Sequence, residues 1–109
     1  MNKEKIFEQV EKRRQNLIDD VCTMIHIDSQ RTEPKEGMPF GSGVNEALLK
    51  ALKICQREGL ATGNCDGYMG YGQWGVGERY IGIMGHLDVV DIGKGWNDPA
   101  FSAAIHDGK

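Results

Sequence analysis

The sequence has no apolar run that approaches the ~20 residues a helix needs to cross a bilayer. Its start, Met1 to Lys5, leads into a charged amphipathic segment instead of the apolar core of a signal peptide. It also lacks an excess of positive charge, because 13 basic and 16 acidic residues leave a net charge of -3. We therefore expect a cytoplasmic protein that binds neither nucleic acid nor membrane.

Cysteine is scarce as well. Cys22, Cys55 and Cys65 are odd in number, far apart and free of any Cys-x-x-Cys pair. This spacing indicates neither a disulfide framework nor a thiolate zinc site, and it favours reduced, mostly buried thiols. With 109 residues the chain has room for one small domain, and we find no internal repeat, linker or low-complexity tract.

Apolar residues recur at intervals of three, four and seven in the first part of the chain. This periodicity predicts one long amphipathic helix from Lys3 to Ile27. Asp28 to Pro39 has no periodicity and is typical of a connecting loop. A second helix is predicted to start with Ser42 as its cap and to stop at Gly59.

Glycine is abundant, at 15 of 109 residues, and most of it follows Gly59, which predicts turns and short strands. Strands are expected near Leu60–Cys65, Tyr68–Trp74, Arg79–Met84 and Ser102–His106, with Arg79–Met84 as the buried one and with Val89 and Val90 extending the sheet. Turns are expected at Asp66-Gly67, Gly75–Glu78 and Asp107-Gly108. Two helices followed by a mainly stranded part of a mixed sheet indicate an α/β or α+β architecture, and periodicity alone does not choose between them.

The strongest local motif is Gly85-His86-Leu87-Asp88, which follows the apolar run ending at Met84. Ligands gather at the carboxyl ends of strands in open α/β sheets. On an extended chain, residues two apart project to the same side, so Asp88 can fix the tautomer of His86 and raise its basicity as a zinc ligand. A bare His-x-Asp is more often a structural histidine hydrogen-bonded to a nearby carboxylate, so the surrounding sequence has to decide.

That surrounding sequence resembles the PepV-like (Xaa-His, carnosinase-type) dipeptidases. The resemblance rests on the run Ile81–Val90, on Gly95-Trp96, Pro99 and Phe101, and on Asp107-Gly108-Lys109. Pro39–Val44 and Asp66–Tyr71 also look like this branch. The branch belongs to a wider group of zinc aminoacylases, acetylornithine deacetylases, succinyl-diaminopimelate desuccinylases and glutamate carboxypeptidases, which carry a similar Gly-His-x-Asp segment.

The resemblance implies that residues 1–109 are the N-terminal, incomplete part of an α/β zinc-exopeptidase catalytic domain. It implies that His86 binds one of two zinc ions, with cobalt or manganese as substitutes, and that Asp88 is the catalytic residue that orients its imidazole. The substrate would be a small dipeptide with a free N-terminus, hydrolysed by a metal-activated water with a separate glutamate as base. The family places the remaining ligands after a segment like Asp107–Lys109, so we expect the isolated chain to be inactive.

Two other functions stay open: an amino-acid deacylase of the same group, and a truncated remnant or binding module without catalysis. Asp91 stands where the family usually has proline, and we expect a tolerated turn, with an outer-shell carboxylate as the alternative. A strand taken from a larger sheet exposes its edges, so self-association is also expected.

Three further features carry weaker signals. Gly70 to Gly75 spells Gly-x-Gly-x-x-Gly, but a turn and a strand are expected after it, which favours a hairpin over a dinucleotide site. His26 and His106 lack partners at ligand spacing and are expected to be structural. Trp96, Pro99 and Phe101 form either a substrate entrance or aromatic packing beneath a long loop.

Overall fold

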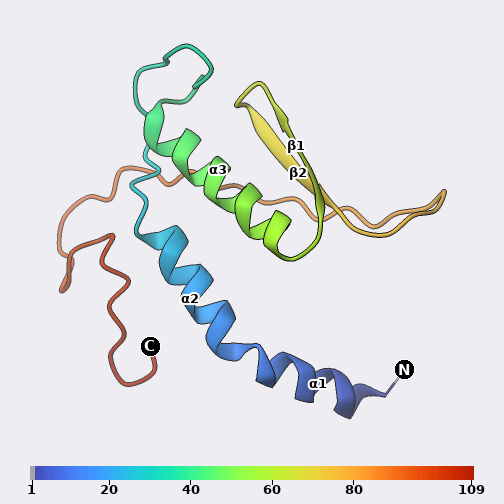
Figure 1. Ribbon diagram of the computed structural model, residues 1–109. Helices are drawn as coiled ribbons and strands as arrows, with labels where there is room; N and C mark the ends of the chain where they lie inside the picture. Colours follow the sequence, from blue (N-terminus) through green and yellow to red (C-terminus); the bar gives the residue numbers. More distant parts are fainter. Residues whose placement is uncertain (1) are drawn as a thin grey trace.

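The computed structural model describes residues 2–109, which form three helices, a two-stranded antiparallel sheet and a long C-terminal stretch without regular structure (Figure 1). The elements are α1 (Lys3–Lys12), α2 (Arg14–Ile25), α3 (Ser42–Arg57), β1 (Ala61–Cys65) and β2 (Met69–Gln73). The predicted α/β class, with helices preceding strands, is confirmed.

The prediction of one unbroken helix from Lys3 to Ile27 is wrong, because the helix breaks at Arg13. Arg13 has φ -97° and ψ 2°, and it separates α1 from α2. Its side chain donates to Glu58 Oε2 at 2.6 Å, just past the end of α3. The periodicity was correct for both halves, but a contact with a residue 45 positions away cannot be read from a local repeat.

Helix α3 begins as predicted at Ser42, but Ser42 is not its cap. Gly41 holds that position with φ 94°, no side chain caps the helix, and Gly41 O accepts from Asn45 N at 3.2 Å. A Cβ on Gly41 would lie 1.9 Å from Thr32 Oγ1, so only glycine fits at the position that precedes the helix. The predicted stop at Gly59 is confirmed, since this glycine has φ 83° just after the helix end.

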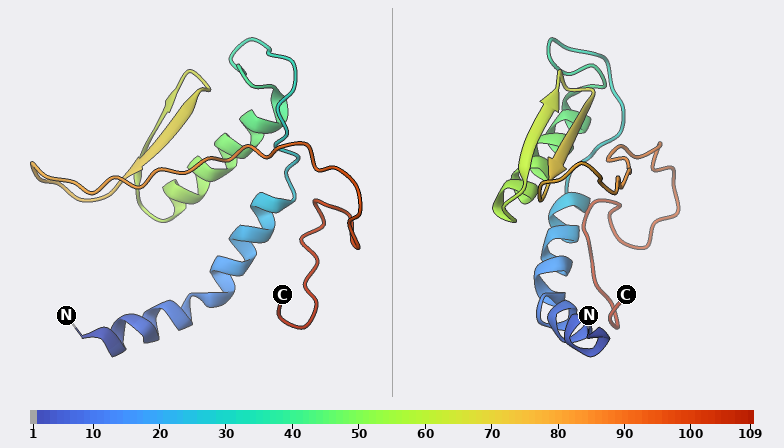
Figure 2. Two further views of the ribbon diagram at one scale, coloured as in Figure 1. Left: turned by 180° about the vertical axis from the view of Figure 1, so that it is seen from behind. Right: turned by 90° about the vertical axis from the view of Figure 1, so that its right-hand side faces the viewer.

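The hairpin of β1 and β2 lies along α3 in both views of Figure 2. Cys65 pairs with Met69 across the predicted turn, where Asp66 has φ 54° and Gly67 has φ 78°. Gly70 brings the strand close to α3, because a Cβ there would lie 2.9 Å from side-chain carbons of Leu48 and Leu52. The first two predicted strands and their turn are therefore confirmed.

The core is small. Its buried apolar residues are Ile27, Val44, Ala47 and Leu48, with the hydroxyl-bearing Ser29 beside them. The expectation of mostly buried thiols is wrong, since Cys22 and Cys55 are half-buried and Cys65 is exposed.

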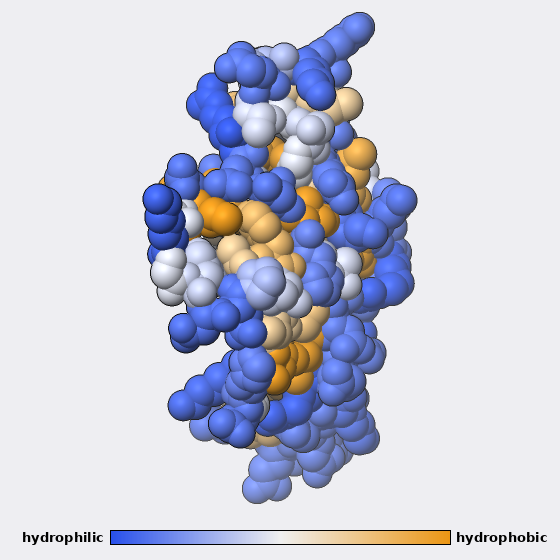
Figure 3. All heavy atoms as spheres, turned by 90° about the vertical axis from the view of Figure 1, so that its left-hand side faces the viewer, coloured by the Kyte–Doolittle hydropathy of each residue, from blue (hydrophilic) through white to orange (hydrophobic). Residues whose placement is uncertain are grey.

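The chain has an accessible surface of 9441 Å², whereas a compact monomer of this size exposes about 6000 Å². Figure 3 shows an apolar strip on one face, bordered by hydrophilic residues.

The third predicted strand, Arg79–Met84, is absent. Tyr80, Ile81, Ile83 and Met84 are 92–97% exposed, and no strand partner for them exists within residues 2–109. A strand with apolar residues on both faces needs neighbours and covering layers, which this stretch of chain does not supply.

The strand predicted at Ser102–His106 is also absent, and Ala103 there has a positive φ of 51°. Val89 forms one isolated parallel bridge with Gln30 and does not extend the hairpin sheet. The terminal turn at Asp107-Gly108 is confirmed, with both residues at positive φ. No helix within residues 2–109 has the length and apolarity to cross a membrane.

Candidate functional site

The Gly85–Asp88 motif sits where the extended chain returns to the end of α2. Val89 N donates to Ser29 O at 3.2 Å, directly after the motif. Ile92 N donates to the side-chain oxygen of Gln30, also at 3.2 Å. Ser29 is only 4% exposed, so these two bonds fix the chain after Asp88 to a buried part of the molecule.

His86 and Asp88 lie together, as two residues spaced by one on an extended chain should. His86 Nδ1 lies 3.0 Å from the main-chain oxygen of Asp88 and 3.3 Å from its carboxylate Oδ1. A carbonyl oxygen can only accept, so this contact favours a proton on Nδ1, and in the neutral ring with that tautomer Nε2 has the free lone pair. The imidazole is 83% exposed, which leaves Nε2 open to a ligand.

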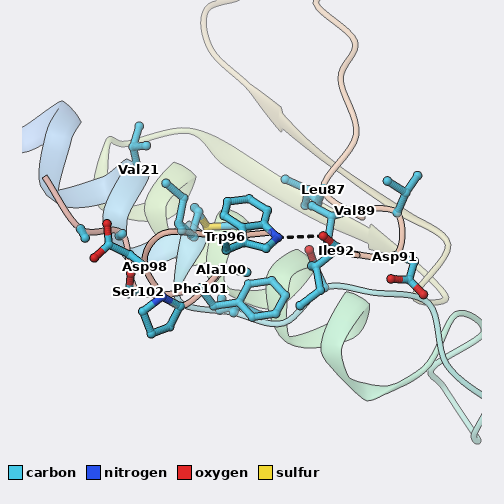
Figure 4. Close-up of a pocket in the computed structure, with 18 of the residues that line it drawn as sticks. Val21, Leu87, Val89, Asp91, Ile92, Trp96, Asp98, Ala100, Phe101 and Ser102 are labelled. Carbon is cyan, nitrogen blue, oxygen red and sulfur yellow. Dashed lines mark hydrogen bonds between the residues drawn. The ribbon is translucent and has the colours of Figure 1, made fainter. Parts of the chain in front are cut away.

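A groove of about 890 Å³ opens beside this motif, and His86 is among the residues that line it. Its walls come from α2 and from residues 86–104, and they include Val21, Met24, Ile25, Leu87, Trp96 and Phe101. The Trp96 indole donates through Nε1 to Ile92 O at 2.8 Å, the dashed bond in Figure 4. Trp96 and Phe101 thus line an open apolar groove instead of packing beneath a closed loop.

The other two histidines hold the walls of this groove in place. His26 Nδ1 donates to Phe101 O at 2.9 Å, and His106 Nε2 lies 2.9 Å from Asp98 Oδ2. Both therefore have structural partners, as predicted. The Asp91 carboxylate accepts from Gly93 N at 2.7 Å, which confirms that this residue forms a turn.

The described residues do not form a complete metal site. Within residues 2–109, no group of three histidine, cysteine, aspartate or glutamate side chains comes together. A catalytic zinc generally takes three protein ligands, so His86 supplies at most one of them.

An ion cluster joins α2 to the end of α3. Arg57 donates to Asp20, which lines the groove, and to Glu58, which also accepts from Arg13. The hydrogen bonds from Arg57 hold the pKa of Asp20 and that of Glu58 below their ordinary values, with Arg13 adding to the effect at Glu58. Sequence reading missed this cluster, since no local spacing relates Asp20 to Arg57.

The glycine motif at 70–75 has the geometry of a hairpin. Gly70 and Gly72 are in β2, opposite Asn64 and Thr62 of β1, and no helix of the described chain follows Gly75. A helix N-terminus facing a pyrophosphate, which the dinucleotide motif requires, is therefore not formed here.

No family model matches the chain. The chain is 39% identical over 103 residues to "Putative dipeptidase YtjP" of Bacillus subtilis (strain 168), a match that covers 93% of this chain and 22% of that protein. It is 34% identical over 100 residues to a Beta-Ala-Xaa dipeptidase of Lactobacillus delbrueckii subsp. lactis, covering 90% of this chain and 21% of the relative. The chain thus spans about a fifth of the length of these curated relatives.

Proposed function

We propose that this chain is a segment of a metal-dependent dipeptidase, in which His86 binds one of two zinc ions and Asp88 keeps its imidazole in the metal-binding tautomer. The observation that carries the proposal is the bond from His86 Nδ1 to Asp88, which leaves Nε2 free at the edge of the groove. Metal-binding histidines commonly donate their other ring nitrogen to a carbonyl or carboxylate in this way.

Each residue of the motif has a separate task in this proposal. The Asp88 carbonyl accepts the Nδ1 proton, and its carboxylate, 3.3 Å from Nδ1, raises the basicity of the ring through its negative charge. The bonds from Val89 and Ile92 to residues 29 and 30 keep the motif at the groove. When bound, the metals lower the pKa of a water molecule and polarise the scissile carbonyl.

The described residues can supply one metal ligand, His86, but they cannot supply all the ligands of a metal site. The other ligands and the general base would come from parts of a longer protein, of which this chain matches about a fifth in its relatives. The 109-residue chain alone is therefore proposed to be inactive, as part of an incomplete catalytic domain. The cytoplasmic location stays a prediction.

The proposed substrate is a small peptide with a free N-terminus. The dipeptidase names of the relatives favour it over the acylated amino acids that a deacylase would take. The apolar groove with Trp96 and Phe101 suits an uncharged substrate side chain.

The tautomer of His86 can be tested on the chain as it exists. A long-range ¹H–¹⁵N NMR spectrum should show His86 protonated at Nδ1, and added zinc should shift the Nε2 signal. His106→Ala, which removes a histidine paired with Asp98, is the matched control and should leave these signals unchanged. A neutral His86 protonated at Nε2 would remove the basis for the proposed metal ligand.

Activity needs the longest polypeptide that contains this sequence. That protein should cleave a β-alanyl dipeptide only with metal present, and His86→Ala should abolish cleavage. Turnover of N-acetyl amino acids without dipeptide cleavage would favour the deacylase. Metal-independent turnover of the dipeptide would contradict the proposal.

A further inference from the structure

The peptide group between Asp88 and Val89 is bonded on both of its sides. Its carbonyl oxygen, Asp88 O, lies 3.0 Å from His86 Nδ1. Its N–H, on Val89, donates to Ser29 O at 3.2 Å. A peptide group is planar, so the direction of its N–H fixes the direction of its carbonyl. The bond to Ser29 O therefore holds the Asp88 carbonyl in the orientation in which it meets the His86 ring.

The residue that accepts the Val89 bond belongs to the small core. Ser29 is 4% exposed, and Ile27, two residues earlier, is 6% exposed. Helix α3 packs directly against this stretch, since a Cβ on Gly43 would lie 1.9 Å from Asp28 O. Groups in a close-packed interior have little room to move. Ser29 O is thus a fixed point to which the chain after the metal-binding motif is attached.

Gln30 joins the same two segments through its side chain. Its Oε1 accepts from Ile92 N at 3.2 Å, and its Nε2 donates to Asp28 Oδ1 at 2.9 Å. The same Asp28 oxygen accepts from Gln30 N at 3.2 Å. An N–H can only donate and a carboxylate can only accept, so the two ends of the Gln30 amide have one consistent assignment. Asp28 thereby restricts this side chain to the orientation that meets Ile92.

We propose that Gln30 is a positioning residue for His86, and that Asp28 supports it. The Val89 bond to Ser29 alone would let the chain after the motif pivot about it, whereas the second bond, at Ile92, removes that freedom. Gln30 thus keeps the Asp88 carbonyl on His86 Nδ1 and leaves Nε2 open to a ligand. The inference rests on the proposed function, and it assigns a role to a residue outside the motif itself.

The tautomer of His86 tests this role directly. Gln30→Met removes both side-chain hydrogen bonds and keeps a side chain of about the same length. In the longest polypeptide that contains this sequence, free of metal and with ¹⁵N-labelled histidine, the neutral His86 ring should change from the Nδ1-protonated form to a mixture of both tautomers. The His86 signals are assigned by their loss in His86→Ala. An unchanged tautomer would overturn the proposal, and Gln30→Asn, too short to reach Ile92, gives the same test if Gln30→Met does not fold.

Gln56→Met is the matched control for this substitution. Gln56 Nε2 donates to Thr62 Oγ1 at 2.9 Å, so the variant also removes a glutamine hydrogen bond between two elements, here α3 and β1. It should leave the His86 tautomer as it is in the parent. An equal change in both variants would mean that any loss of stability alters the ring, and it would contradict a specific role for Gln30.

A double variant tests whether the hydrogen bond to Ile92 is the cause. Asp28→Asn together with Gln30→Glu exchanges an amide and a carboxylate, so the net charge stays the same. The carboxylate at position 30 can still accept from Ile92 N, and the amide at position 28 can donate to it. The double variant should therefore restore the Nδ1-protonated form. If it folds and still shows the mixture of Gln30→Met, the bond to Ile92 does not position the ring and the proposal is wrong.

A zinc titration separates this inference from the proposed function. Zinc affinity should fall about 10-fold in Gln30→Met, at the lower end of the range for partners of metal ligands, and stay near the parent in Gln56→Met. If His86→Ala itself leaves the affinity unchanged, the proposed metal ligand is wrong, and this inference fails with it. If His86→Ala weakens zinc binding but the two glutamine variants bind equally, His86 remains a ligand and only the role of Gln30 is wrong.

Discussion

Arg57 binds Asp20 through two hydrogen bonds, Nη1 to Oδ1 at 2.8 Å and Nη2 to Oδ2 at 2.6 Å. The two planar groups meet fork to fork, which is the geometry in which arginine binds a carboxylate best. This pair connects α2, one wall of the groove, to the end of α3. The groove beside His86 therefore depends on a contact between residues 37 positions apart in the sequence.

The first prediction concerns this pair and pH. The pKa values of Asp20 and Glu58 are lowered in the folded chain, so the stability they contribute is present above the unfolded pKa values. It is lost as pH falls below about 4 through the folded values. Urea midpoints should thus fall in acid, and Arg57→Gln should weaken this dependence. Lys53→Gln, a substitution at an exposed position on α3, should retain the pH dependence of the urea midpoint. If both variants lose this pH dependence equally, the net charge of the chain is its cause instead of the ion pair.

The second prediction concerns the small core. Leu48 is 7% exposed, whereas its neighbour Leu49 is 45% exposed. Leu48→Ala should lower the free energy of unfolding by about 2–5 kcal/mol, because it removes a buried side chain that packs against the hairpin at Gly70. Leu49→Ala should change it by less than about 1 kcal/mol. Circular dichroism at 222 nm during urea unfolding measures both, and equal losses would contradict the assigned core.

The third prediction concerns the close approach at Gly43. A Cβ there would lie 1.9 Å from Asp28 O, so Gly43→Ala forces α3 away from the loop before it. The expected cost is about 1–3 kcal/mol or more. Gly82→Ala is the control, because a Cβ there meets nothing within 4 Å. Thermal unfolding followed by circular dichroism should give a lower unfolding temperature for Gly43→Ala than for Gly82→Ala. Equal unfolding temperatures would mean that the loop can move away from the added methyl group without a loss of stability.

The fourth prediction concerns Asp88 in the longest polypeptide that contains this sequence. Asp88→Asn keeps the carbonyl that accepts from His86 Nδ1 but removes the negative charge 3.3 Å from it. Metal affinity or activity should fall about 10–100-fold, less than for His86→Ala. The Asp91→Asn side chain can still accept the hydrogen bond from Gly93 N, so the metal affinity of this variant, measured by titration, should be close to that of the parent. Equal effects at both positions would argue against a special role for Asp88.

What the sequence predicted correctly depends on near neighbours. The hairpin follows from two short strands around Asp66-Gly67, and the contact of His86 with Asp88 follows from their spacing on an extended chain. The helices were found from periodicity for the same reason. None of these features requires knowledge of distant parts of the chain.

What the sequence failed to predict depends on distant contacts. The break at Arg13 accompanies its bond to Glu58, and no local pattern relates these two residues. The strand expected at Arg79–Met84 has the right composition, but a strand forms only beside a partner, and the described chain provides none. A substrate entrance at Trp96, Pro99 and Phe101 was one of two interpretations of the sequence, but the wall that α2 adds to the groove was not foreseen, because it is distant in the sequence.

The isolated bridge between Gln30 and Val89 has a further consequence for how the protein can change. It brings together the two ends of residues 31–88, so α3 and the hairpin form an excursion that leaves and rejoins the chain at one place. Segments whose ends meet tolerate insertion and rearrangement, because changes within them need not move the flanking chain. The loops of this excursion can therefore vary in length, while the residues next to the bridge, His86 and Asp88 among them, keep their position.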